Sequence, residues 1–230
     1  NVDPVQDPVA HQGTTNDTTP TLEGSVGAAI ATGEEVIIYR STGSQPAAEI
    51  GKATVTGTSW TFTDTSLAAD GTYIYTAVVR NNVGENGPAS NAYQVTLDTV
   101  APTSTATIVD YTDNVAPQEG NFGTGTTTND TSPTLNIAVT GAVGTGEVVA
   151  VYRDGVKVGN ASFVSGSIFS YTDTSLVNAQ SYKYTVRVED AAGNRGTLSS
   201  EFTLNVDTAV PNKLAITEVL DDEQFVVGPI

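Results

Sequence analysis

The sequence lacks the residues on which several kinds of site depend. Its 230 residues include no cysteine, no methionine, one histidine and one tryptophan. Without cysteine there can be no disulfide, no thiol catalysis and no thiolate metal site. A single histidine argues against a Ser-His-Asp triad or a zinc site with several histidine ligands. We therefore expect no enzymatic activity. The absence of methionine, even at residue 1, predicts that the chain is part of a longer protein.

Basic residues and long apolar runs are also scarce. Lysine and arginine number 9 against 26 aspartate and glutamate residues, so the formal net charge is −17. Nucleic-acid phosphates require clustered cations, and no apolar run approaches the roughly 18 residues of a transmembrane helix. We expect neither a nucleic-acid partner nor membrane insertion.

The sequence contains an internal repeat that covers nearly the whole chain. Residues 15–22 (TNDTTPTL) recur as residues 128–135 (TNDTSPTL), and residues 62–67 (FTDTSL) recur as residues 171–176 (YTDTSL). The offset falls from 113 to 109 residues between these two matches, which predicts a longer hairpin loop in the first copy. The chain therefore contains two related units.

Each copy has the pattern of short β-strands. In residues 182–189 (YKYTVRVE) apolar and polar side chains alternate, which is typical of a strand with one buried face. Asp154-Gly155 predicts a type I′ hairpin turn. Residues 67–73 and 176–182 have the spacing of a tyrosine corner, with Tyr73 and Tyr182 as its tyrosines. The predicted fold class is all-β, as tandem immunoglobulin-like antiparallel β-sandwiches, in which Trp60 serves packing.

The repeat alignment also predicts the domain boundaries. Residues 1–98 form repeat 1, which lacks its own strand A. Residues 99–103 are a linker, residues 104–208 form repeat 2, and residues 209–230 begin a third repeat. Residues 213–219 align with strand A of repeat 2. This tail either packs on repeat 2 or donates a strand to repeat 1 of a neighbouring molecule by β-augmentation.

Several segments resemble the bacterial immunoglobulin-like repeat. They are residues 111–115 (YTDNV), 128–135, 151–155 (VYRDG), 189–194 (EDAAGN) and 206–208 (VDT). The resemblance implies the stalk of a giant type I-secreted surface adhesin or biofilm-associated protein. It also implies calcium at or between domain junctions. Residues 80–87 of repeat 1 (RNNVGENG) depart from the family pattern, which leaves a ligand role for that loop in doubt.

Aspartates recur at the predicted strand ends. An immunoglobulin-like strand order places most of them at the pole of each sandwich that faces a junction. Ca²⁺ takes about 6–8 oxygen ligands and tolerates irregular loops better than Mg²⁺ does. We hypothesise that Ca²⁺ binds there, with these candidate ligands: Asp17, Asp98, Asp110, Asp113, Asp130, Asp190 and Asp207. The alternative is that they are caps and turn-formers, because aspartate side chains bond to nearby backbone.

The leading functional hypothesis is a calcium-stiffened spacer of a large extracellular bacterial adhesin that supports cell adhesion and biofilm formation. Its location would be extracellular, at the bacterial cell surface. Its partners would be neighbouring repeats of the same polypeptide, and other domains would contact a host or matrix surface. The alternatives are a glycan- or protein-binding module, which needs an exposed aromatic cluster at a loop pole, or an accessory domain of a secreted enzyme.

Overall fold

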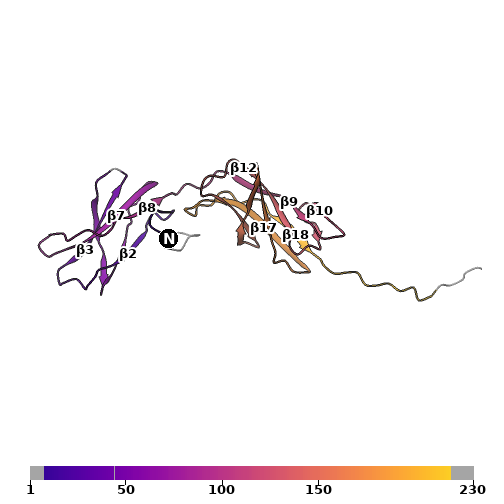
Figure 1. The fold of residues 1–230 in the computed structure, drawn as a ribbon, viewed down its shortest axis with the longest axis horizontal. Helices are drawn as coiled ribbons and strands as arrows, with labels where there is room; N and C mark the ends of the chain where they lie inside the picture. Colours follow the sequence, from indigo (N-terminus) through magenta and orange to yellow (C-terminus); the bar gives the residue numbers. More distant parts are fainter. Residues whose placement is uncertain (1–7, 44, 219–230) are drawn as a thin grey trace, which may run out of the picture.

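The computed structural model describes residues 8–43 and 45–218, which form two β-sandwiches placed end to end (Figure 1). The described residues contain only strands, turns and loops, so the predicted all-β fold is confirmed. None of them belongs to a helix that is long and apolar enough to cross a membrane.

Repeat 1 consists of a five-stranded and a three-stranded sheet. The larger sheet has the order β1-β8-β7-β3-β4, formed by Gly13–Thr15, Tyr93–Leu97, Gly71–Arg80, Glu35–Thr42 and Ala48–Lys52. The smaller has the order β2-β6-β5, formed by Thr21–Ser25, Ser59–Thr63 and Thr54–Thr56. Within these sheets only β1 and β8 pair in parallel. Alternate residues of β3, β7 and β8 form the core between the sheets.

Repeat 2 has two five-stranded sheets. One has the order β10-β9-β12-β16-β15, formed by Gly120–Phe122, Thr105–Asp113, Thr134–Thr140, Ile168–Thr172 and Ser162–Ser165. The other has the order β11-β18-β17-β13-β14, formed by Thr127–Thr128, Phe202–Val206, Gln180–Glu189, Val148–Arg153 and Val156–Asn160. Its core includes the inward side chains of β9, namely Ala106, Ile108 and Tyr111.

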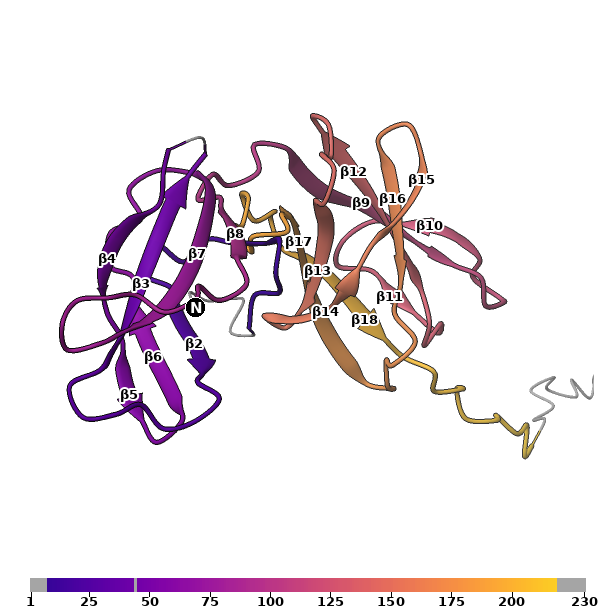
Figure 2. The ribbon, with the colours of Figure 1, turned by 60° about the vertical axis from the view of Figure 1, so that its left-hand side comes forward.

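The two repeats differ at strand β9. In repeat 2, β9 pairs antiparallel with β12 and covers it. The counterpart of β12 in repeat 1 is β2, which among the described strands pairs with β6 alone and forms the sheet edge (Figure 2). As a result Leu22 and Val26 are half-buried, whereas the matching Leu135 and Val139 are buried.

The local predictions are confirmed. Asp154 and Gly155 have φ values of 51° and 81°, as a type I′ turn requires. The Tyr73 hydroxyl donates to the carbonyl oxygen of Ala69 at 2.6 Å. In repeat 2, the Tyr182 hydroxyl accepts from the backbone N–H of Val177 at 2.9 Å. Each tyrosine thus bonds back to the chain four or five residues upstream.

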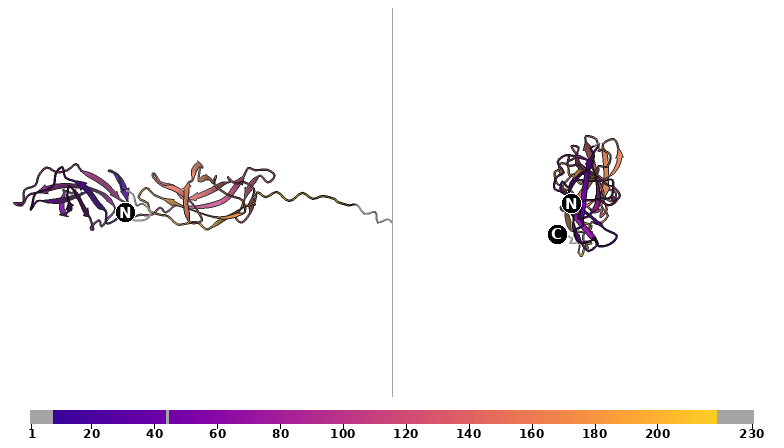
Figure 3. Two further views of the ribbon diagram at one scale, coloured as in Figure 1. Left: turned by 90° about the horizontal axis from the view of Figure 1, so that it is seen from below. Right: turned by 90° about the vertical axis from the view of Figure 1, so that its left-hand side faces the viewer.

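The described part of the tail, residues 209–218, is exposed and forms no strand. It leaves the end of repeat 2 that is remote from repeat 1 (Figure 3). Leu214 and Ile216 are 92% and 89% exposed. The hypothesis that the tail packs on repeat 2 is therefore wrong for these residues, and the rest of the predicted strand lies outside the described residues.

Candidate functional site

The junction between the repeats is held by the loop that joins β17 to β18. The side-chain Nδ2 of Asn194 donates to the carbonyl oxygen of Asp98, at the end of repeat 1, over 2.8 Å. The same nitrogen donates to Asp190 Oδ2 at 2.9 Å, and the Asn194 backbone N–H donates to Asp190 Oδ1 at 2.8 Å. Asn194 therefore connects the linker to the loop of repeat 2.

The linker also packs closely against this loop. Pro102 is buried. A Cβ on Gly196 would lie 3.0 Å from the carbonyl oxygens of Pro102 and Val188, closer than ordinary side-chain contacts allow. Glycine at this position therefore permits the linker to approach the end of β17.

Five of the predicted ligands support the backbone that follows them. In each, Oδ1 accepts a hydrogen bond of 2.7–3.1 Å from the backbone N–H two residues later. This is the geometry of an Asx turn. It fixes the direction of the chain where it leaves or enters a strand. The five residues are Asp17, Asp98, Asp113, Asp130 and Asp207.

The other two predicted ligands lie elsewhere. Asp110 is within β9, where its Oδ1 accepts from Asn136 Nδ2 at 2.6 Å on the neighbouring strand β12. Asp190 lies in the junction loop and is bonded to Asn194. The seven carboxylates are thus spread over several turns, one strand and the junction loop.

Within residues 8–43 and 45–218, no three acidic, histidine or cysteine side chains come close enough to hold a metal ion. Three side-chain oxygen atoms of repeat 2 are nevertheless buried without a hydrogen-bond partner among the described residues: Ser104 Oγ, and the oxygens Asn129 Oδ1 and Asp130 Oδ2 of two consecutive residues. Thr128 Oγ1 accepts from the Asp130 backbone N–H at 2.9 Å and donates to Asp113 Oδ2 at 2.5 Å. Asn129 Oδ1 and Asp130 Oδ2 are amide and carboxylate oxygens, which are the ligand types that Ca²⁺ prefers. The calcium site stays a prediction.

A buried ion-pair network that the sequence analysis missed occurs in both repeats. In repeat 1, Asp64 Oδ2 accepts from Arg40 Nη1 at 2.5 Å and from the Tyr75 hydroxyl at 3.0 Å. Its Oδ1 accepts from the backbone and the hydroxyl of Ser66. Burial acts to raise the pKa of Asp64, but the hydrogen bonds from Ser66 and Arg40 outweigh it and leave the pKa below its usual value.

Repeat 2 contains the same network. Asp173 accepts from Arg153 at 2.7 Å, from the Tyr184 hydroxyl at 2.8 Å and from Ser175. Burial raises the pKa of Tyr184, and its bond to Asp173 raises it further, so the hydroxyl stays protonated and donates. All four residue types recur at matching positions of the repeat alignment, which was the signal available in the sequence.

A second ion pair occurs in both repeats with its charges reversed. In repeat 1, Arg80 of β7 bonds to Glu49 of β4 at 2.7 Å and donates to the Tyr39 hydroxyl at 2.6 Å. In repeat 2, Glu189 of β17 takes the place of Arg80 and bonds to Lys157 of β14 at 2.7 Å. The Tyr152 hydroxyl donates to Glu189.

Burial acts to raise the pKa of Glu189, but the hydrogen bonds from Lys157 and Tyr152 outweigh it, and the pKa lies below its usual value. Arg80 is the first residue of the segment 80–87, in which repeat 1 departs from the family pattern. The reversal accounts for this residue, because Arg80 pairs with an acidic residue of the neighbouring strand where Glu189 pairs with a basic one.

Over 161 residues, 67% of this chain, the sequence is 35% identical to Exoglucanase B of Cellulomonas fimi. The chain spans 13% of that protein's length.

Among solved structures, the chicken CNTN1 FN1-FN3 domains match with a TM-score of 0.47 and 14% identity, over 86% of this chain and 69% of that one. A tetra-tandem repeat in the extending region of a large adhesion protein matches with a TM-score of 0.30 and 19% identity, over 85% of this chain and 50% of that one. The model of the bacterial Ig-like domain matches residues 7–99 and again residues 105–208, and the chain therefore belongs to that family.

Proposed function

We propose that the two repeats are a calcium-stiffened spacer in the stalk of a large extracellular bacterial adhesin, which supports cell adhesion and biofilm formation. The observation that carries this proposal is the junction. Asn194 bonds the linker carbonyl of Asp98 to the loop of repeat 2, and Pro102 is buried beside it. A short linker that is bonded and packed in this way restricts the angle between successive repeats, which is what a stalk needs.

The surface chemistry supports a spacer over a binding module. The aromatic side chains exposed among the described residues are Tyr93, at 37%, and Phe163, at 64%. They lie on strands β8 and β15 of different repeats and form no shared cluster at a loop pole. The net charge of −17 favours solubility, and the repulsion between like charges opposes contact between distant parts of a long stalk.

The calcium component of the proposal rests on the pole of repeat 2. Asp130 Oδ2 and Asn129 Oδ1 would bind the ion, with Asp113 beside them through Thr128. Bound Ca²⁺ would neutralise buried negative charge at the strand ends, and water would complete its coordination. Extracellular modules bind Ca²⁺ with dissociation constants of about 10⁻⁴–10⁻³ M, so 10 mM Ca²⁺ should stabilise repeat 2 by about 1.4–2.7 kcal/mol.

The junction is tested by Asn194→Ala. Small-angle scattering should show greater motion between the repeats, because the bond to Asp98 is lost. The matched control is Asn178→Ala, which removes a bond of 2.7 Å from the Thr208 backbone N–H at the opposite end of repeat 2. Equal scattering profiles for the two variants would contradict the stiffening role of the junction.

The calcium site is tested by calorimetric titration and by melting curves with Ca²⁺ or EDTA. Asp130→Asn should remove the gain in melting temperature. The matched control is Asp154→Asn, which removes one exposed carboxylate from the type I′ turn and should keep the gain. If the melting temperature is the same in Ca²⁺ and in EDTA, the calcium component is wrong while the spacer component stands.

A second candidate is an accessory spacer of a secreted enzyme, which the similarity to Exoglucanase B favours. The same stiff junction would then separate a catalytic domain from another module. The two candidates are distinguished by the other domains encoded in the same gene: a catalytic domain supports the accessory role, whereas many further copies of this repeat support the adhesin stalk.

A further inference from the structure

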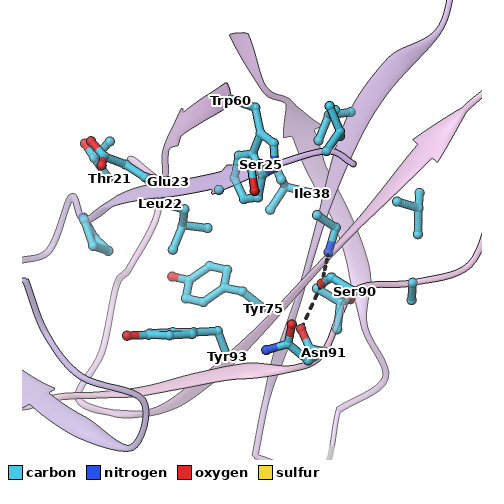
Figure 4. A pocket seen from close by; sticks show the side chains of 18 of the residues that line it. Thr21, Leu22, Glu23, Ser25, Ile38, Trp60, Tyr75, Ser90, Asn91 and Tyr93 are labelled. Atoms are coloured by element: carbon cyan, nitrogen blue, oxygen red, sulfur yellow. Dashed lines mark hydrogen bonds between the residues drawn. The ribbon is translucent and has the colours of Figure 1, made fainter. Parts of the chain in front are cut away.

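The hairpins β7–β8 and β17–β18 are nearly interchangeable on their inward faces. Strand β7 pairs with β3 in repeat 1, and β17 pairs with β13 in repeat 2. Figure 4 shows Tyr75 of β7 on the inward face, pointing toward Leu22 of the smaller sheet. Burial of apolar surface discriminates poorly between the hairpins, because their inward residues are of the same kind at matching positions. These residues are Tyr73, Tyr75, Val95 and Leu97 in repeat 1, and Tyr182, Tyr184, Leu204 and Val206 in repeat 2.

The buried ion-pair network also accepts either hairpin. The Tyr75 hydroxyl donates to Asp64 at 3.0 Å, and the Tyr184 hydroxyl donates to Asp173 at 2.8 Å. Exchanging the two tyrosines would place the same donor on the same kind of carboxylate. Wrong pairing between neighbouring repeats is a characteristic way in which repeat proteins misfold. The correct choice of hairpin therefore needs a signal outside the shared inward residues and the shared network.

The outer faces of the two hairpins differ in the sign of their charge. Arg80 of β7 bonds to Glu49 of β4 at 2.7 Å. Glu189 takes the matching position of β17 and bonds to Lys157 of β14 at 2.7 Å. Glu49 and Lys157 each lie opposite the tyrosine of the central strand, so the two ion pairs occupy the same place in their sheets.

Pairing of β7 with β13 would bring two cations together. Arg80 would then lie next to Lys157 in place of Glu49. Within its own hairpin, Arg80 Nε donates to Asn86 Oδ1 at 2.8 Å, and this partner carries no charge. Like charges that face each other across strands are destabilising. The hairpin of repeat 1 is thus a poor partner for β13 and β14.

Pairing of β17 with β3 would bring carboxylates together. Glu189 would take the place of Arg80, which in the native sheet lies opposite Glu35 and bonds to Glu49. Arg187 and Arg195 would move with Glu189, because they lie 3.1 Å and 3.8 Å from it within residues 180–206. They offset part of the repulsion, but Glu189 would still exchange the attraction of Lys157 for the repulsion of two carboxylates.

We propose that the reversed ion pair selects the partner of each hairpin, so that β3 and β4 accept β7–β8 and reject β17–β18, and repeat 2 does the converse. The short linker holds both repeats at a high local concentration, so this selection acts during folding. Packing adds a second difference, because buried Ile37 and Val78 lie opposite each other where repeat 2 has Ala150 and Arg187. The selection does not depend on calcium or on the spacer function.

The absence of cysteine from the chain allows a direct assay. Ser41 of β3 lies opposite Ile74 of β7, and Lys183 is the matching residue of β17. The chain with Ser41→Cys and Lys183→Cys can form an internal disulfide only where β17 lies beside β3. It is refolded rapidly from urea at low concentration with an oxidant, and peptide mapping of the monomer gives the linked fraction. Ser41→Cys with Ile74→Cys reports the native pairing in the same way.

Two variants at the same positions test the role of polarity. Arg80→Glu with Glu49→Lys gives repeat 1 the polarity of repeat 2 and should raise the 41–183 linkage about tenfold, because repulsive contacts of the exchanged pairing become attractive. Arg80→Lys with Glu49→Asp keeps the polarity and should leave the linkage at the level of the parent. No rise in the reversed variant, or an equal rise in both variants, would overturn the proposal.

Salt provides a test that needs no change of charge. About 1 M NaCl shortens the screening length to about 3 Å. It should raise the 41–183 linkage of the parent, because the repulsion in the exchanged pairing weakens. In the variant with Arg80→Glu and Glu49→Lys it should lower the linkage, because there the exchanged pairing is attractive. A linkage in the parent that does not respond to salt would contradict selection by charge, even if the reversed variant fails to fold.

Discussion

The substitution Asp64→Asn tests whether the buried network stabilises repeat 1. Asp64 is 1% exposed and accepts hydrogen bonds from Arg40, Tyr75 and Ser66. Asparagine has nearly the same shape, and its Oδ1 can still accept the two bonds from Ser66. It removes the negative charge and places an amide where Oδ2 accepts from Arg40 and Tyr75. The substitution therefore separates the role of the charge from the role of the turn.

The structure sets the size of the effect. Breaking a buried ion pair by removing one partner costs about 3–5 kcal/mol, because the remaining charge is left uncompensated. The Arg40 side chain is 16% exposed, so water partly hydrates it after the substitution. We therefore expect a loss near the lower end, about 3 kcal/mol. For a domain of about 100 residues this corresponds to a fall in melting temperature of about 12 °C or more.

The assay uses Trp60, which lies in β6 of repeat 1 and reports the unfolding of that repeat. Asp64→Asn should shift the Trp60 fluorescence transition. The matched variant Asp173→Asn alters the same network in repeat 2 and should leave the Trp60 transition in place while shifting a second transition seen by circular dichroism. Equal shifts of the Trp60 transition, or a loss below about 0.5 kcal/mol for Asp64→Asn, would refute this reasoning.

Three further predictions concern the Glu189 ion pairs, the Tyr73 hydrogen bond and the pH dependence of the buried network. Glu189→Gln should destabilise repeat 2 by about 2–4 kcal/mol in urea unfolding, because Lys157 and Arg187 then lose their buried counter-charge; an unchanged midpoint would contradict this. Tyr73→Phe should cost about 1 kcal/mol by the Trp60 transition, since only the bond to the Ala69 carbonyl is lost. The pKa values of Asp64 and Asp173 lie below their usual value when the protein is folded, so their stabilisation is complete above about pH 4 and is lost as the pH falls further. Acid titration should therefore lower both transitions below about pH 4, and Asp64→Asn should flatten the pH dependence of the Trp60 transition.

The features that the sequence predicted are those encoded within a few neighbouring residues. The alternation in residues 182–189, the turn at Asp154-Gly155 and the spacing before Tyr73 each specify a local geometry, and the structure contains all three. The repeat supplied the rest of the fold, because two copies of one pattern predict two copies of one sandwich. These signals need no knowledge of which strands pair.

The positions of the carboxylates were harder to predict, because they depend on contacts between distant residues. Strand order predicted that Asp113 and Asp130 share a pole, and both bond to Thr128 there. It did not predict that Asp110 bonds to Asn136 within the sheet. The ion pairs of Asp64 and Asp173 connect residues 24 and 20 positions apart, so their partners follow from the register of the sheets rather than from local sequence.

The two repeats together explain why one ion pair can reverse its charges and the other keeps them. A tyrosine hydroxyl both donates and accepts. At the reversible site, Tyr39 therefore accepts from Arg80, while Tyr152 donates to Glu189. At the buried network, the same carboxylate must also accept a backbone N–H, from Ser66 in repeat 1 and from Ser175 in repeat 2.

No cation can accept a hydrogen bond, so exchanging Asp64 with Arg40 would remove the acceptor of the part-buried Ser66 N–H, at a cost of about 0.5–1.5 kcal/mol beyond the change in packing. The backbone turn thus fixes the sign of the buried pair. Among the described residues, the pairs Arg80–Glu49 and Lys157–Glu189 have no such bond to a backbone N–H, and their polarity is free to differ between repeats that share one fold.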